Sequence, residues 1–560
     1  MKIFKKESSI ILLLLLVCSF FFFFKLGSYK LIDVDEPRYA EAAREMLANS
    51  NWITPYFNYE LRFDKPIFFY WLVMISFLFF GISEFAARFP SALLATALVL
   101  FTYYFGRTTV SRSFGLISSL ILATSLEFIA MARMSITDMT LIFFVSATIY
   151  SAILATFSKS SFKKCWWWLA YLFCGIAVLT KGPLGIILTG IVLIPYLILT
   201  GKLKESLNPK FTIPGFIIFA LAVIPWYYAI IAEHGRAFTD YFFIKHNISR
   251  FSGDFIQHQQ PFYFYFAVIF IGFFPWAIYF IPIAIKEILN LCKHIVNSKV
   301  EFKKLNFALL KEADNKSKII TLSIMWFISM LALFSVSKAK LITYILPLFP
   351  AMSLLTGNMW NDFIQNNKNT KMINLSAKVF TAVCFIMGLI ATFGLNLLLP
   401  RDEKLHVAHF NPIFIIIFMV IPIFMLFYLK KNHKIKAFIT TIILMSVITS
   451  VAINNIVHIV YNSGQKDLIN YITLSKSLPL FNNKLVTYNL TKPSIVFYSR
   501  HKIIDIPSID KLTEILNNQN PILIAARNKD LNEIQANTKF YLVRKGARYS
   551  LISNINITSP

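Results

Sequence analysis

Long apolar runs separated by short polar segments make up most of the chain. Runs of this length predict helices that cross a membrane, because about 20 consecutive apolar residues span the hydrocarbon core of a bilayer. The pattern predicts about thirteen spans. They lie at residues 10 to 24, 85 to 106, 114 to 132, 138 to 157, 166 to 181, 183 to 200, 211 to 232, 262 to 285, 319 to 336, 341 to 360, 375 to 399, 412 to 430 and 437 to 460.

The first run follows a basic flank, MKIFKKESS, as the apolar part of a signal peptide does. No small-residue cleavage site follows it, only KLGSYKLIDVDE, and we therefore expect a retained first span with its N-terminus in the cytoplasm. The apolar stretch at residues 67 to 82 is expected to be a short or re-entrant juxtamembrane segment. Counting it as a full span would reverse the side of every later loop.

This arrangement places the basic loops in the cytoplasm, as the positive-inside rule requires. Charged residues on the opposite side are the candidates for function, because the rule does not account for them. The cytoplasmic loops contain GRTTVSR, SKSSFKK, GKLKESLNPK, the Lys-rich residues 286 to 318 and KKNHKIK. The opposite side receives residues 27 to 66, the ARMSITD turn, residues 233 to 261, SKAK, residues 400 to 411 and the chain after Tyr461.

The sequence becomes polar after Tyr461. KLVTYNL, KIIDIP and PILIAARN predict strands, KPSIVFYS and DKLTEILNN predict helices, and KFYLVRKGARYSLISNI predicts a closing hairpin. We expect a transmembrane domain at residues 1 to 460, with residues 27 to 66 as its first extracytoplasmic loop, and an extracytoplasmic α/β domain at residues 461 to 560. The predicted fold class is a polytopic α-helical membrane protein with a small C-terminal α/β domain.

Composition agrees with this class, since 57% of the 560 residues are hydrophobic and only 15% are charged. The net charge of +27 would indicate nucleic-acid binding in a soluble protein, but here loop placement explains most basic residues, and no nucleic-acid partner is expected. The five cysteines form no CxxC, and the chain has no HExxH, Walker or GxGxxG pattern. Disulfides, a zinc cluster and nucleotide-driven chemistry are therefore not indicated.

The stretch DVDEPRYAEAAREML directly follows the first span and is rich in charge. Asp35 and Glu36 precede Pro37, an order suited to capping the start of a helix. Taken alone, the stretch is typical of a capped amphipathic helix on the membrane surface. Its three- and four-residue spacing would place together Arg38, Glu41, Arg44 and Glu45.

Later segments bring further charged groups to the same side. Lys65 in RFDKPIFFYW precedes apolar sequence, where a lysine can simply reach to the interface. Asp138 lies at the mouth of two spans beside Arg133, and an ion pair between them is the structural alternative to a functional role. Lys181 in TKGPLG is expected to have only a minor role, as an interface anchor. IKHNISRF and SVSKAKLITYILP add Lys245, His246, Arg250, Lys338, Lys340 and Tyr344.

Lysines and arginines at headgroup depth suit the phosphate of a lipid, but bulk lipid does not explain the carboxylates. DEPRYAEAAREML, FDKPIFFYW, the isolated Asp138, KHNISRF and SKAKLITYILP occur in this order. In these motifs, from about residue 30 to 360, the chain resembles the lipid A aminoarabinose transferases, relatives of the protein O-mannosyltransferases in the GT-C superfamily. The resemblance implies an inner-membrane glycosyltransferase that takes a sugar from a polyprenyl-phosphate carrier on the periplasmic side.

The resemblance also implies roles for individual residues. Asp35 and Asp138 match the acidic residues of the family's transfer site, and Glu36 is expected to act beside them. Lys65, Arg250 and Tyr344 match positions that hold the carrier phosphate, to which Lys338 and Lys340 would contribute. Expected substrate contacts are Arg38, Glu41, Arg44, Arg133 and His246. The segment KHN departs from the family's more acidic HEH-like run, which leaves the sugar and the acceptor open.

The implied chemistry is displacement of a lipid phosphate, whose charge grows as the glycosidic bond breaks and which the cations would stabilise. A lipid A phosphate acceptor is already ionised, so Asp35 and Asp138 would orient the sugar or balance charge. A hydroxyl acceptor would require one of them to take a proton. Asp33, Asp35 and Glu36 could bind a divalent cation, but the nearby cations supply the needed charge. No cofactor and no essential metal are expected.

Three hypotheses about function follow. The leading one is transfer of a sugar, with an amino sugar favoured, from undecaprenyl phosphate to lipid A. The second is a protein O-glycosyltransferase, or another envelope glycosyltransferase that uses a polyprenyl-phosphate sugar. The third is a transporter or flippase for a lipid-linked sugar, which should have ionisable residues near the bilayer midplane and internal repeats. The charges lie at one face and no repeat is evident, which disfavours the transporter.

Overall fold

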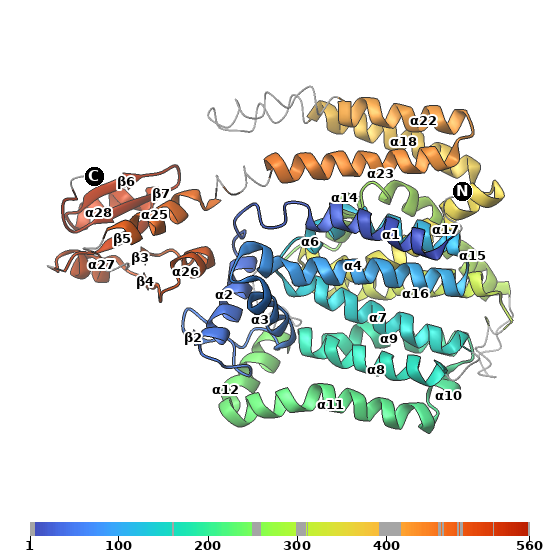
Figure 1. The fold of residues 1–560 in the computed structure, drawn as a ribbon, viewed down its shortest axis with the longest axis horizontal. Helices are drawn as coiled ribbons and strands as arrows, with labels where there is room; N and C mark the ends of the chain where they lie inside the picture. The colour runs from blue at the N-terminus through green and yellow to red at the C-terminus, as the bar shows by residue number, and fades with distance from the viewer. Residues whose placement is uncertain are drawn as a thin grey trace.

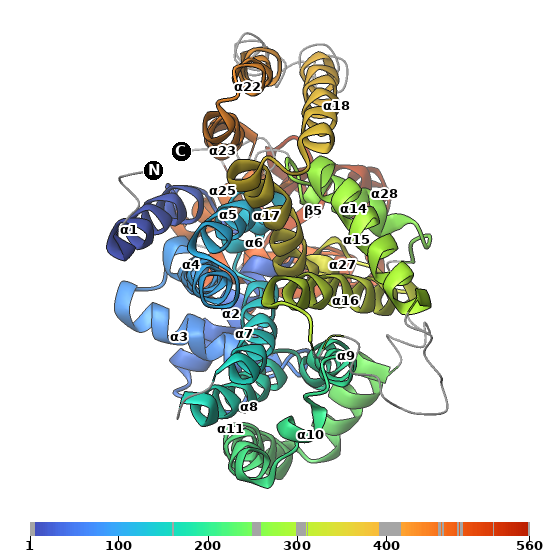
Figure 2. The ribbon, with the colours of Figure 1, turned by 90° about the vertical axis from the view of Figure 1, so that its right-hand side faces the viewer.

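Parallel and antiparallel helices form a bundle, and a small α/β unit lies beyond one end of it in the computed structural model (Figure 1). Viewed along the helix axes, α4, α7, α16 and α17 lie towards the middle, while α11, α18 and α22 lie at the periphery (Figure 2). The structure describes residues 6–158, 162–248, 259–297, 310, 312–390, 416–456, 461, 464–478, 481, 485–518 and 520–557.

Within these residues, eight helices are long and apolar enough to cross a membrane, which confirms the prediction of a polytopic helical membrane protein. A ninth span is the bent pair α5 (Arg112–Ala123) and α6 (Leu126–Ala132), if the two count as one. The eight are α4 (Glu84–Thr109), α7 (Thr137–Phe157), α8 (Phe162–Lys181), α11 (Pro209–His234), α16 (Asn315–Val336), the pair η4 (Ile342–Leu348) and α17 (Phe349–Asn366), α18 (Thr370–Leu389), and α23 (Lys434–Val451) with η7 (Ala452–Ile456).

Shorter helices complete the bundle, and each apolar run predicted as a span carries at least one helix. The expected single span at residues 114 to 132 is instead bent by 69° between α5 and α6. Apart from α15 (Ala277–Asn297), which has 21 residues, these helices are α1 (Glu7–Cys18), η2 (Ser19–Phe23), α9 (Leu184–Leu199), α10 (Leu203–Ser206), α12 (Arg236–Thr239), η3 (Asp240–Ile248), α14 (Phe264–Gly272), η6 (Ile416–Val420) and α22 (Ile421–Lys430).

The apolar stretch at residues 67 to 82 forms α3 (Phe68–Phe80), which has only 13 residues. At 1.5 Å per residue it is about 20 Å long, shorter than the hydrocarbon core of a bilayer. The Ser76 hydroxyl donates to the Ala86 carbonyl at 2.6 Å and fixes α3 against α4. This length fits the predicted juxtamembrane segment.

The C-terminal unit is a five-stranded sheet in the order β4-β3-β5-β7-β6. β3, β4 and β5 are parallel, and the antiparallel β6–β7 hairpin pairs with β5 through β7. The predicted strands, helices and hairpin are all present. Its elements are α25 (Lys466–Ser477), β3 (Leu485–Tyr488), α26 (Pro493–Ser499), β4 (Ile504–Ile506), α27 (Ile509–Leu516), β5 (Leu523–Arg527), η9 (Asn528–Asp530), α28 (Leu531–Asn537), β6 (Tyr541–Lys545) and β7 (Tyr549–Ser553).

Helices cover both faces of this sheet, because alternate strand residues point to opposite sides. Leu485 and Leu523 belong to the apolar cluster with α25 and α26. Their neighbours Val486 and Ile524 belong to the cluster with α27 and α28. Both faces of the central strands are thus buried, as is usual where strands are parallel.

A buried ion pair anchors the first loop to the bundle. Arg88, on α4, donates to both carboxylate oxygens of Glu36 at 2.7 and 2.8 Å, and both side chains are fully buried. Glu36 also accepts from the Ile32 and Ser135 N–H groups at 2.8 and 2.9 Å. The remaining guanidinium bonds of Arg88 go to the carbonyls of Leu26, Tyr29 and Lys30. The loop is therefore held by one arginine whose donors are all used.

The helix predicted after the first span is α2 (Asp35–Ala48). The expected side-chain cap is wrong, because Val34 occupies the N-cap position and no side chain caps the helix. Glu41 and Arg44 instead form a buried ion pair with two bonds of 2.7 Å. Glu45 accepts from the Tyr59 N–H at 2.9 Å. This bond ties α2 to the small hairpin of β1 (Tyr56–Phe57) and β2 (Glu60–Leu61).

Replacing Arg88 by methionine is expected to lower the free energy of unfolding by about 3–5 kcal/mol, because Glu36 would keep a buried charge without its partner. The matched control is Arg107→Met on the same helix, since Arg107 forms a partly exposed ion pair with Glu7. The control should cost no more than about 1 kcal/mol. Thermal or denaturant unfolding of the full chain in detergent measures both. Equal effects of the two substitutions would contradict the anchoring role of the Arg88 ion pair.

Burial raises the pKa of the Glu45 carboxyl from 4.5 to about 7; the Tyr59 N–H opposes this shift and the nearby Glu41 adds to it. Between these two values the unfolded chain loses the proton while the folded chain keeps it, so stability falls as pH rises through this window. Glu45→Gln stays neutral and lacks this loss. The unfolding temperature of the variant, relative to the wild type, should therefore rise between pH 5 and pH 8.

The control for this pH dependence is Glu60→Gln in the neighbouring hairpin, because the Glu60 side chain is 71% exposed. Its unfolding temperature should follow that of the wild type at every pH. A Glu45→Gln difference that stays constant from pH 5 to pH 8 would show that Glu45 ionises normally.

Candidate functional site

An acid, a cation and a phenol meet at the end of the bundle nearer the α/β unit. The Lys181 ammonium lies 2.9 Å from Asp138 Oδ1, and both side chains are largely buried, with 10% and 13% exposed. The same ammonium lies 5.8 Å from the centre of the Tyr344 ring. These groups line one cavity, together with Leu141, Leu184, Phe334, Thr343 and Pro347.

Local structure brings these side chains together from three distant segments. Asp138 lies in the first turn of α7, and Lys181 is the last residue of α8. Gly182 follows with φ +71°, a backbone conformation that glycine adopts without strain, and turns the chain into α9. Tyr344 comes from the short η4 helix before α17. The cavity therefore lies where several helices end.

Asp138 has a different partner from the one considered in the sequence. Arg133 is buried and donates to the carbonyls of Phe21 and Phe24 at 3.2 and 2.8 Å. Lys181, which was expected to anchor the chain at the interface, pairs with Asp138 instead. Arg133 closes the end of the first span rather than contacting the cavity.

Asp35, the other acid of the expected site, lies at the start of α2 with 64% of its side chain exposed. Its nearest cation is Arg38, at 3.9 Å. Asp35 and Asp138 both lie close enough to Tyr39 for their charges to act on its hydroxyl group. The two acids therefore lie within electrostatic reach of the same hydroxyl group.

Further cations and acids surround this region. Arg62 is buried, pairs with Asp64 at 2.8 Å and donates to the Tyr70 hydroxyl at 3.1 Å. It also lies over the ring of Tyr39, 5.5 Å from the centre. Lys65 follows Asp64 in the chain, is half-buried and takes part in an interaction of its own. The expected phosphate-binding lysine thus directly follows the Arg62–Asp64 ion pair in the chain.

Several other residues expected in the site make structural contacts instead. Glu36 is fully buried in its ion pair with Arg88 and therefore exposes no oxygen to a substrate. Glu41 and Arg44 satisfy each other inside α2. Lys340 is buried and donates to the carbonyls of Ser337 and Gln260, at 2.6 and 3.2 Å. Lys338 is exposed. Arg250 and the side chain of His246 lie outside what the structure describes.

A buried acid that the sequence analysis did not consider lies nearby. Glu127, on α6, is 5% exposed, and neither of its carboxyl oxygens has a hydrogen-bond partner among the described residues. It lies within electrostatic reach of Asp138. An acid inside an apolar run, here SLEFIAMA, was the available signal for it. Lys181 had no such signal beyond its position at the end of an apolar run, and Arg62, in the first loop, had none.

The acids do not form a metal site within the described residues, where no group of three or more His, Cys, Asp or Glu side chains is placed to hold an ion. Of the three acids considered for a cation, Glu36 is used by Arg88. Asp33 accepts from the Ser494 N–H and hydroxyl groups at 2.9 and 2.6 Å. Only Asp35 keeps a largely exposed carboxylate.

Comparison with known proteins agrees with this architecture. Residues 8–239 match the family model described as dolichyl-phosphate-mannose-protein mannosyltransferase. The crystal structure of ArnT from Cupriavidus metallidurans bound to undecaprenyl phosphate superposes with a TM-score of 0.77 at 20% identity, covering 98% of this chain and 99% of that chain. At that identity the match shows the fold, and the fold is of the GT-C type.

Two relatives extend the comparison. An uncharacterized protein of Aquifex aeolicus is 35% identical over 58% of this chain and 67% of its own length. The undecaprenyl phosphate-alpha-4-amino-4-deoxy-L-arabinose arabinosyl transferase of Erwinia tasmaniensis is 30% identical over 64% of this chain. That alignment spans 62% of the Erwinia enzyme. The chain belongs to one family with the Aquifex protein, its residues 8–239 match the protein mannosyltransferase family, and its fold is that of ArnT.

Proposed function

We propose that this enzyme transfers a sugar, with an amino sugar favoured, from undecaprenyl phosphate to lipid A on the periplasmic face of the inner membrane. The observation that carries the proposal is the cavity lined by Asp138, Lys181 and Tyr344 at one end of the bundle. A carboxylate and a cation held together beside a cavity suit a donor that carries a sugar at one end of a phosphate. Family membership supplies the reaction class, glycosyl transfer from a polyprenyl-phosphate sugar.

The cations and the carboxylates have separate roles in the proposed reaction. The bond between the sugar's anomeric carbon and the phosphate oxygen breaks, and the phosphate leaves with the electron pair. Lys65, Arg250 and Tyr344 are proposed to stabilise its growing charge, and Lys181 adds a further cation at the cavity that Tyr344 lines. Asp138 and Asp35 orient the sugar and balance the positive charge that develops on its ring. A lipid A phosphate oxygen then forms the new bond without giving up a proton.

The ion pair between Lys181 and Asp138 places two opposite charges side by side at the cavity. Each side chain is more than four-fifths buried, and an unpaired charge at that depth would be costly. Donor binding can exchange this pair for two new ones, the phosphate with Lys181 and the sugar with Asp138. The site is therefore charged in advance and requires no metal to hold the donor.

A protein hydroxyl is the second candidate acceptor, favoured by the description of the matching family model. A hydroxyl must lose its proton as it attacks, and Asp138 or Asp35 would then act as the base. A transporter for the lipid-linked sugar receives no support from the arrangement. The charged cluster lies at one end of the bundle, whereas a carrier is expected to bind its substrate near the midplane.

Lipid A from cells that lack the gene should have lost the mass of one amino sugar. The wild-type gene should restore that mass, while Asp138→Asn and Lys181→Met should reduce transfer at least about 100-fold, because each removes a charge from the cavity. The matched control is Lys316→Met, since the Lys316–Asp362 ion pair connects α16 and α17 outside the proposed site. Mass spectrometry of lipid A, with immunoblots for protein level, measures the effect.

An unchanged lipid A profile after deletion of the gene would contradict the proposed acceptor, and glycoproteins would be examined for a lost sugar. Loss of transfer in the Lys316→Met control at normal protein level would contradict the assignment of the cavity.

The proposed site is periplasmic only if the chain beyond Tyr461 is also periplasmic. Alkaline phosphatase fused after Tyr461 should be active, because this enzyme folds only in the oxidising periplasm. The matched fusion after Lys431, within KKNHKIK, should be inactive, because the positive-inside rule places that loop in the cytoplasm. The reverse pattern of activities would place the cavity on the cytoplasmic side.

A further inference from the structure

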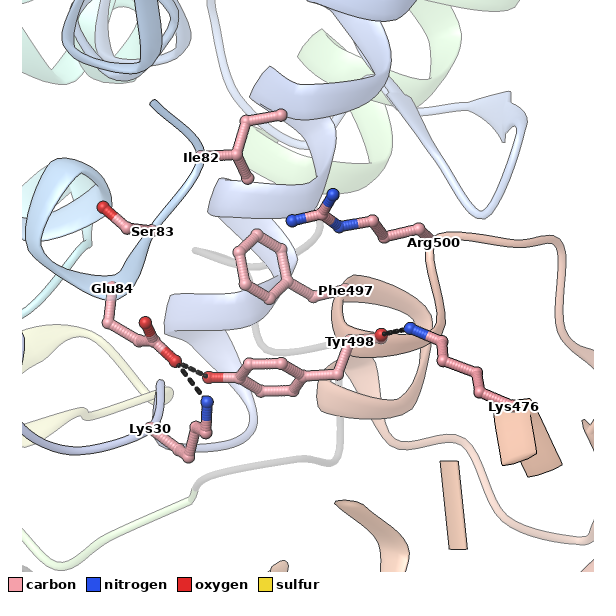
Figure 3. A pocket seen from close by; sticks show the side chains of 8 residues that line it. All are labelled: Lys30, Ile82, Ser83, Glu84, Lys476, Phe497, Tyr498 and Arg500. Carbon is pink, nitrogen blue, oxygen red and sulfur yellow. Dashed lines mark hydrogen bonds and ion pairs between the residues drawn. The ribbon is translucent and has the colours of Figure 1, made fainter. Parts of the chain in front are cut away.

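A second pocket lies at the seam between the bundle and the α/β unit, and Figure 3 shows it from close by. It has a volume of about 280 Å³, is partly open to the surroundings and shares no lining residue with the Asp138 cavity. The bundle contributes the loop before α2 and the turn between α3 and α4, and the α/β unit contributes α25 and α26. The lining residues of this seam pocket are Lys30, Ile82, Ser83, Glu84, Lys476, Phe497, Tyr498 and Arg500.

The single acid of the seam pocket is already satisfied. Glu84 Oε1 lies 2.9 Å from the Lys30 ammonium and accepts from the Tyr498 hydroxyl at 3.2 Å. One cation therefore balances the one acid.

Two further cations have no acid opposite them in the part of the chain that the structure describes. The Lys476 ammonium donates to the Tyr498 carbonyl at 2.9 Å and forms no ion pair with a described acid. The Arg500 side chain points over the pocket towards Ile82 and Phe497 (Figure 3). Burial and the charge of Arg500 lower the pKa of Lys476, as expected for two neighbouring cations. An anion placed between them would relieve this repulsion.

Apolar side chains at the rim indicate where that anion comes from. Ile82 lines the pocket and is 39% exposed. The last turns of α3, just before it, present Leu78, Phe79 and Phe80 to the surroundings, and Phe79 is 80% exposed. α3 is an apolar helix of a membrane protein, so these side chains face lipid. A cationic pocket next to a lipid-facing surface has the arrangement expected for a lipid headgroup with its acyl chains alongside.

We propose that the seam pocket binds the phosphate of an anionic membrane lipid between Lys476 and Arg500. The lipid's acyl chains lie along the exposed end of α3. Because the lining residues come from both the bundle and the α/β unit, the bound lipid holds the two together. The proposal is independent of the sugar, the acceptor and the reaction.

The bound lipid also bears on the loop that carries Asp35. The Tyr498 hydroxyl accepts from the Leu31 N–H at 2.8 Å, and the Lys30 carbonyl accepts from Arg88 at 3.0 Å. Residues 30 to 35 thus run from the seam pocket directly to the start of α2. A lipid that fixes Lys476, Tyr498 and Arg500 limits the movement of this segment.

The test uses the full chain purified in a neutral detergent, with lipid binding measured by native mass spectrometry. The probes are phosphatidylglycerol, phosphatidylcholine with the same acyl chains, and inorganic phosphate. Phosphatidylglycerol should bind more tightly than phosphatidylcholine. Arg500→Gln with Lys476→Gln should weaken phosphatidylglycerol binding at least about tenfold, since each cation near a lipid surface contributes measurably to anion binding. Lys502→Gln is the control, because Lys502 is exposed and pairs with Glu60.

Each outcome of the lipid titration either supports or contradicts the proposal. Equal affinity for the two lipids, or no difference between the double variant and the Lys502→Gln control, would overturn the proposal. If inorganic phosphate binds as tightly as phosphatidylglycerol, the pocket is a site for a soluble anion and not for a lipid. If the double variant fails to fold by circular dichroism, Arg500→Gln alone decides, since the exposed Arg500 side chain contributes no buried contact. Arg500→Lys, which keeps the charge, should retain most of the affinity.

Discussion

The ion pair between Glu36 and Arg88 is the contact on which the candidate site depends. An arginine buried among apolar helices must satisfy five N–H donors without water, and here one carboxylate and three carbonyls of the first loop do so. The same carboxylate accepts from the Ser135 N–H, three residues before Asp138. Asp35 precedes Glu36 in the chain. A single buried acid therefore positions the segments that carry both acids of the proposed reaction.

This arrangement separates structural charges from reactive ones within one short motif. Asp33, Asp35 and Glu36 lie within four residues of each other, but each has a different environment. Asp33 is bonded to Ser494 of the α/β unit, and Glu36 is bonded to Arg88 of the bundle. Asp35 alone remains largely exposed, because its two neighbours hold the backbone on either side of it. Asp35 therefore stays accessible to a substrate because Asp33 and Glu36 are held by other residues.

Much of the fold could be predicted from the sequence because hydrophobic length and alternation are local properties. The apolar runs form helices, and α3 is too short to cross the membrane, as predicted. The strands and helices after Tyr461 lie where the sequence predicts them. The bend between α5 and α6 could not be predicted, since it depends on contacts such as the bond from the Leu126 N–H to the Phe274 carbonyl. Which strands pair is likewise decided by tertiary packing.

The candidate site could be predicted only in part, for a related reason. The residue types and the end of the bundle follow from motifs, but the partner of each charge follows from helix packing. Lys181 is 43 residues away from Asp138 and pairs with it, whereas Arg133, five residues away, turns to backbone carbonyls. Sequence proximity favoured the wrong cation. Spacing can predict pairs within one helix, such as Glu41 and Arg44, but not pairs between helices.

Two sets of polar contacts thus hold the segment from Lys30 to Glu36. Arg88 fixes it from within the bundle, and Tyr498 and Ser494 fix it from the α/β unit. The first set is buried and permanent, because breaking it would expose a charge to the membrane interior. The second set lies at the seam with the α/β unit, beside two cations that have no acid opposite them among the described residues, and is therefore open to an anion from the lipid. A membrane enzyme that positions an acid with one fixed and one adjustable contact can hold its site in place while still responding to the bilayer around it.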